Sequence, residues 1–175
     1  MSYCEIIYFQ DGKPVAGQEF KNAHGGAAFI WSALSKRYLG HDNWMMAGVL
    51  NEGRALWDLA KRQDLSVFER AVHAATFDRA IVRREDFTQF AADLRKFVET
   101  YPPRDRVCHL LSWASAVESS EHEAIGFYMM SVSDNLWFGR DEDDKDSDES
   151  IPYNLNEQNE HFEVYDYLAK TEKSE

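Results

Sequence analysis

The chain has 175 residues, of which 44% are hydrophobic and 14% aromatic. That length fits one domain with a sizeable core, and the composition excludes an intrinsically disordered protein. The net charge of −12 disfavours direct binding to nucleic-acid phosphates, which requires a surface rich in Lys and Arg. Two cysteines, Cys4 and Cys108, are too few for a disulfide framework. The first residues lack a signal-peptide pattern and no stretch approaches the ~18 apolar residues of a membrane span, so we expect a cytoplasmic protein.

The first predicted element is a β-hairpin between Tyr3 and Phe20. Residues Tyr3 to Phe9 are rich in β-forming side chains, and Asp11-Gly12 supplies a tight turn. Because the first strand is apolar on both faces, we expect it to lie inside a sheet or to be covered on both sides.

Four to five helices are predicted from apolar residues that recur every three or four positions. Their boundaries come from capping residues, glycine and proline. The first predicted helix starts at Ala27 and ends at Gly40, and the second follows a cap at Asp42 or Asn43. The third opens with the capping box Ser66 to Glu69. The fourth runs from Phe87 to Tyr101 before Pro102-Pro103, and another follows a cap at Asp105.

Further strands are predicted at residues 74–82 and 124–132, and residues 161–168 fit either a strand or a helix, with a strand preferred. The fold class is therefore α+β. We expect a single domain with a small, mainly antiparallel sheet, and we expect the helices to pack largely against one side of that sheet.

The negative charge is concentrated near the C-terminus. From Arg140 to Glu175 the chain carries 13 acidic and 4 basic side chains, a net of −9, whereas residues 1–139 carry 18 and 15, a net of −3. The sequence thus divides into a nearly balanced body (1–139), an acidic loop (140–152) and a C-terminal segment (153–175) that is expected to pack back on the body and to fray at its end.

Of the nine positions from Asp141 to Glu149, seven are carboxylates. An EF-hand that starts at Asp141 would need glycine at its sixth position and glutamate at its twelfth, where this chain has Asp146 and Pro152. The run therefore lacks the pattern of a dedicated calcium site. No histidine or cysteine pair has the spacing of a zinc site, so no metal and no cofactor is expected.

His24-Gly25-Gly26 precedes the first predicted helix and offers backbone amides to an anion. A tight strand-to-helix turn explains the same residues without a ligand. The chain has no P-loop, no G-x-G-x-x-G and no G-x-S-x-G motif, so an enzyme is the less favoured class.

Trp137 and Phe138 adjoin the acidic run. An aromatic pair beside dense charge has the composition of an interaction hot spot, although the two rings can equally anchor the loop to the core. Of the other tryptophans, Trp31 and Trp57 lie on apolar helix faces and are predicted to be core, and Trp113 lies off its helix face and is predicted to be partly exposed.

These features lead to the hypothesis of a binding or inhibitory protein that docks on a basic, nucleic-acid-handling protein, as phage anti-defence proteins, antitoxins and immunity proteins do. The alternatives are a nucleotide-binding or anion-binding domain or an enzyme that uses His24, Gly25 and Gly26, and a domain whose acidic loop is merely solvated. The predicted partner-binding residues are Trp137, Phe138, Asp141, Glu142, Asp143, Asp144, Asp146, Asp148 and Glu149.

Overall fold

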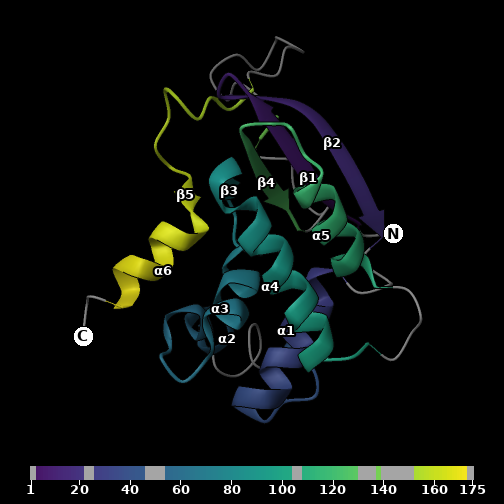
Figure 1. The fold of residues 1–175 in the computed structure, drawn as a ribbon. Coiled ribbons are helices and arrows are strands. Elements are labelled where there is room, and N and C mark those ends of the chain that lie inside the picture. Colours follow the sequence, from purple (N-terminus) through teal and green to yellow (C-terminus); the bar gives the residue numbers. More distant parts are fainter. Residues whose placement is uncertain are drawn as a thin grey trace, which may run out of the picture.

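The structure, a computed structural model, describes residues 3–21, 26–45, 54–103, 108–129, 137–138 and 152–172. These residues form one α+β domain in which helices pack against a mixed five-stranded sheet (Figure 1). The strand order is β2-β1-β4-β3-β5, and all neighbouring strands are antiparallel except β3 and β5. The predicted α+β class is confirmed.

The predicted hairpin is confirmed, and its first strand lies inside the sheet between β2 and β4. Asp11 and Gly12 at its tip both adopt positive φ angles, 51° and 77°, as a type I′ turn requires. The strands are β1 (Tyr3–Gln10), β2 (Lys13–Lys21), β3 (Ala80–Arg83), β4 (Ala124–Tyr128) and β5 (Phe162–Glu163).

Local signals set several helix ends as predicted. Gly40 adopts a left-handed φ of 75° where the first helix ends, and Ser66 and Glu69 form the capping box of the third. The α-helices are α1 (Ala27–Leu34), α2 (Ala55–Asp58), α3 (Val67–Ala74), α4 (Phe87–Thr100), α5 (His109–Glu118) and α6 (Val164–Glu172). A π-helical segment, Ser35–Leu39, extends α1, the 3-10 turn Leu59–Lys61 extends α2, and another, Arg84–Asp86, precedes α4.

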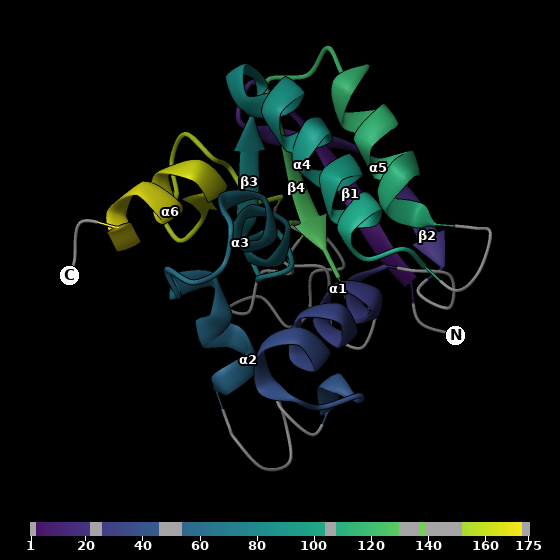
Figure 2. The same ribbon diagram turned by 60° about the horizontal axis from the view of Figure 1, so that its bottom comes forward.

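The two faces of the sheet are covered differently. Helices α3, α4 and α5 lie on one face (Figure 2) and enclose the main core, into which Ile6 and Phe127 point. Ile7, the next residue of β1, belongs to a smaller cluster on the opposite face. That second cluster consists of Ile7, Phe9, Ile81, Ala124, Tyr128, Trp137, Tyr153 and Leu155. Because both faces are buried, β1 is apolar on both sides.

Two predicted strands differ from the observed elements. The strand expected from residue 74 begins only at Ala80, because α3 continues to Ala74 and a turn that ends at Arg79, with a φ of 62°, follows it. The segment 161–168 contains a strand of only two residues before α6, since Val164 and Leu168 are spaced for one buried helix face. In the strand predicted at 124–132, residues 130–132 lie outside the described part of the chain.

The prediction for Trp113 was wrong, because its exposed fraction is 1%. Helix α5 packs against both α4 and the sheet, so its buried face is wider than a single apolar stripe. The Trp113 ring contacts those of Phe20 and Phe127 at centroid distances of 6.1 and 6.0 Å. Among the helices that the structure describes, none has both the length and the apolar composition needed to cross a bilayer.

Candidate functional site

The candidate site is the point at which the acidic run leaves and rejoins the body. We call it the loop base and define it as Trp137, Phe138 and residues 152–161. The predicted contact residues Asp141, Glu142, Asp143, Asp144, Asp146, Asp148 and Glu149 lie outside the described residues, so the structure places only the two ends of the run.

Trp137 forms one wall of the loop base and is buried, with an exposed fraction of 1%. Its indole N–H donates a hydrogen bond to the backbone carbonyl of Phe127 at 2.9 Å. The ring makes edge-to-face contacts with Phe9 and Tyr153 at centroid distances of 5.1 and 5.3 Å. Of the two roles considered for Trp137, the structure thus shows the anchoring one, and its ring offers no surface to a partner.

Gly126 explains how so large a ring reaches the sheet. It lies in β4 under Trp137, where a Cβ atom would come within 3.0 Å of the rings of Trp137 and Phe9. A side chain at this position would push the indole off the sheet. Phe138 is half-buried and packs against the second cluster, so it keeps part of its ring exposed beside the acidic run.

The loop base is closed by the backbone. The amide of Tyr153 donates a hydrogen bond to the carbonyl of Trp137 at 2.9 Å, which brings together the two residues that flank 138–152. The Leu155 amide donates to the carbonyl of Gly12 at 2.8 Å and so joins the loop base to the hairpin tip. Gly12 is tightly enclosed, because a Cβ there would lie 2.5 Å from the side chain of Asn156.

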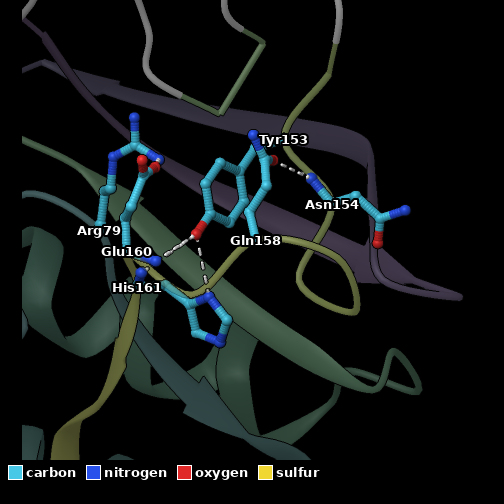
Figure 3. A network of polar contacts seen from close by, with 6 residues as sticks. All are labelled: Arg79, Tyr153, Asn154, Gln158, Glu160 and His161. Atoms are coloured by element: carbon cyan, nitrogen blue, oxygen red, sulfur yellow. Dashed lines mark hydrogen bonds and ion pairs between the residues drawn. The ribbon is translucent and has the colours of Figure 1, made fainter.

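The hydroxyl of Tyr153 fixes the segment that follows (Figure 3). It accepts hydrogen bonds from the backbone amides of Glu160 at 3.0 Å and His161 at 3.1 Å, and it lies 3.1 Å from Nδ1 of His161. Burial, and then the charge of Arg83, lowers the pKa of His161, which favours a neutral ring whose Nδ1 accepts the hydroxyl proton. With two bonds accepted and one donated, this hydroxyl is fully used in holding the backbone.

Arg79 completes this network from the turn before β3. Its guanidinium lies over the Tyr153 ring, 4.7 Å from the centroid, and pairs with Glu160 at 2.6 Å (Figure 3). Next to it, Asn154 donates its backbone N–H to the side-chain carbonyl of Gln158 at 2.8 Å. Polar contacts thus hold the segment from Tyr153 to His161 against the body.

The charge around this segment is negative. Arg79 and Arg83 are engaged by Glu160 and Glu163 at 2.6 and 2.7 Å. Burial raises the pKa of Asp86, and nearby carboxylates, including that of Glu163, raise it further.

A second polar cluster surrounds Glu69, which is buried at the start of α3. Its carboxylate accepts hydrogen bonds from Ser66, from the Tyr38 hydroxyl at 2.8 Å and from the Tyr101 hydroxyl. Burial raises the pKa of Glu69, but these hydrogen bonds outweigh that effect and lower it overall. The cluster joins the π-helical extension of α1, the start of α3 and the C-terminal end of α4, and has the character of a structural support.

The alternative site at His24-Gly25-Gly26 is placed only in part. Gly26 is the N-cap of α1, which has no acidic residue in its first turn, and residues 22–25 lie outside the described part. The anion-binding hypothesis therefore stays a prediction. No group of three His, Cys, Asp or Glu side chains is arranged for a metal ion within the described ranges.

Sequence reasoning missed Tyr153 and His161. A signal existed in Pro152-Tyr153-Asn154, where an aromatic residue between turn formers follows the acidic run much as Trp137 precedes it. Comparisons with protein-family models, curated proteins and solved structures found no match for this chain.

Proposed function

We propose that this protein docks on a basic protein surface through the acidic run Asp141–Glu149 and acts as a binding or inhibitory protein. The main support is the hydrogen bond between Tyr153 and Trp137, which makes the run an insertion with joined ends. Because both ends of the run are held together, its conformational entropy is already reduced before binding. The run therefore loses less conformational entropy on docking than a tail with one free end would.

The partner favoured by this chemistry is a nucleic-acid-handling protein. Such proteins carry Lys and Arg side chains placed for phosphates, and carboxylates can accept the same hydrogen bonds. A run with seven carboxylates in nine positions could occupy those sites and exclude the nucleic acid. Phage anti-defence proteins, antitoxins and immunity proteins are classes in which this activity is used. Phe138, next to the run, would add an apolar contact.

The test compares two full-length variants of equal net charge. In the loop variant, the seven carboxylates from Asp141 to Glu149 become Asn or Gln. The control makes the same change at seven exposed carboxylates of the body: Asp11, Glu19, Asp42, Asp64, Asp78, Glu85 and Glu99.

Each protein is immobilised and used to capture partners from a lysate, and the captured proteins are quantified at increasing salt. We expect the parent and the control to retain a basic, nucleic-acid-binding protein that a DNA or RNA oligonucleotide displaces, and the loop variant to lose it. Equal capture by the loop variant and the parent would refute the proposal and leave the run a solvated loop.

A further inference from the structure

An open groove lies between α5 and the sheet, apart from the loop base. Tyr8 of β1 and Gln18 of β2 form one wall, residues of α5 from Leu111 onward with the C-cap Ser119 form the other, and the loop to His122 closes one end. Its volume is about 880 Å³, enough for a long side chain together with part of the peptide that carries it. Helix α5 runs beside β2, the edge strand of the sheet (Figure 2), and several of the residues on its side of the groove are serines, whose small side chains leave this space open.

Three hydroxyls that line the groove, those of Tyr8, Ser115 and Ser119, already donate their protons within the protein. The hydroxyls of Ser115 and Ser119 donate to the backbone carbonyls of Leu111 and Ala116 in their own helix, at 3.1 and 3.4 Å. The Tyr8 hydroxyl donates to the side-chain carbonyl of Gln18 at 3.0 Å. Because these three protons are already used, the three oxygens present lone pairs and can accept hydrogen bonds from an occupant that carries donors.

The charge of the groove points the same way. Among the described residues that line the groove, Glu121 is the one with a full charge, its side chain is exposed, and none is Lys or Arg. Among these residues an anionic ligand would thus meet a carboxylate and neither Lys nor Arg. The rings of Tyr8 and His122 lie 5.2 Å apart at 42° and add aromatic surface, which attracts cations.

We infer that this groove binds an arginine side chain presented by a basic peptide or protein. A guanidinium has five donors and no acceptor, carries a permanent positive charge and is flat enough to lie against an aromatic ring. The ammonium of lysine offers three donors on a compact, strongly hydrated centre and fits the ring pair less well. This inference does not rest on the acidic run, because every residue used in it belongs to β1, β2, α5 or the segment from Ser119 to His122.

The test is an NMR titration of the isotope-labelled, full-length loop variant, in which the acidic run is neutral and cannot itself attract the peptide. The probes are a capped triarginine peptide, its lysine counterpart and its citrulline counterpart, which keeps the shape of arginine without the charge. We expect saturable shifts at Tyr8, Ser115, Ser119 and His122 with arginine, weaker ones with lysine and none with citrulline. Equal responses to all three peptides, or shifts elsewhere only, would overturn the inference.

Two substitutions locate the contact. Glu121→Gln and Tyr8→Leu should each weaken arginine binding roughly twofold to fivefold, the range for a solvent-exposed ion pair or cation–π contact. Asp78→Asn, which removes an exposed carboxylate outside the groove, should leave the affinity unchanged. Glu121 is exposed, so its substitution tests the site even if Tyr8→Leu impairs folding. Unchanged affinity in Glu121→Gln would contradict the assignment.

Discussion

Replacing Trp137 with alanine separates the two roles that its position beside the acidic run allows. If the ring were an exposed contact, the substitution would weaken partner binding and leave stability nearly unchanged. The structure predicts a large loss of stability, because the indole is buried, packs edge-to-face on Phe9 and Tyr153, and donates to the carbonyl of Phe127.

The size of that loss follows from the contacts. Each edge-to-face pair contributes about 0.5–1.5 kcal/mol and the buried hydrogen bond about 1 kcal/mol, in addition to the apolar area that the ring removes from water. Truncation of a buried tryptophan to alanine therefore lowers the free energy of unfolding by about 3–5 kcal/mol. Trp137→Phe keeps most of the packing but leaves the Phe127 carbonyl without its donor, so a loss of about 1–3 kcal/mol is expected.

Urea unfolding monitored by circular dichroism measures both losses. Phe138→Ala is the matched control, since Phe138 is adjacent but only half-buried, and its truncation should lower the free energy of unfolding by about 1 kcal/mol. If Trp137→Ala were no more destabilising than Phe138→Ala, the anchoring role derived from the contacts of the indole would be refuted.

Three other predictions concern the packing of the body. Burial lowers the pKa of His73 to about 3, so between this value and about 6.5 the unfolded state binds more protons than the folded state. The contribution of His73 to the free energy of unfolding is therefore fully present above pH 6.5. Below pH 6.5 the free energy of unfolding should fall by about 1.4 kcal/mol per pH unit. His73→Leu should remove that part of the acid sensitivity in urea titrations at several pH values, and an unchanged pH slope would contradict the argument. Gly126→Ala should lower the free energy of unfolding by about 1–3 kcal/mol, because the new methyl group meets two rings within 3.0 Å, whereas a neutral effect would mean that the rings can move. Tyr165→Phe removes the hydroxyl that donates to buried Asp93 at 2.7 Å, so amide hydrogen exchange in α6 should accelerate by about tenfold, and unchanged protection would argue against this contact as a tether of α6.

The parts of the fold that follow from neighbouring residues could be predicted. Asp11-Gly12 favours a type I′ turn on its own, and Ser66 with Glu69 forms a capping box within four residues, so the sequence predicted both features. The position of β1 inside the sheet also followed, because Ile6 and Ile7 can both be buried only if each face of the strand is covered.

The remaining features depend on residues far apart in sequence. Ala74 looked compatible with a strand, but it is the last residue of α3, the helix capped by Ser66, and its burial there decided between helix and strand. Trp113 was misjudged because the burial of α5 depends on its second neighbour, the sheet. In the loop base, the Trp137 ring lies over Gly126 of the sheet and contacts the ring of Tyr153. No local sequence pattern connects these three positions.

The central claim is that the acidic run docks on a basic partner. The most direct measurement is the slope of log affinity against log salt concentration for the captured partner, compared between the parent, the loop variant and the control of equal charge. A contact made by the run predicts a steep decline for the parent and the control, and a much shallower one for the loop variant, because fewer ions are then displaced on binding. The same slope in all three proteins would contradict the claim.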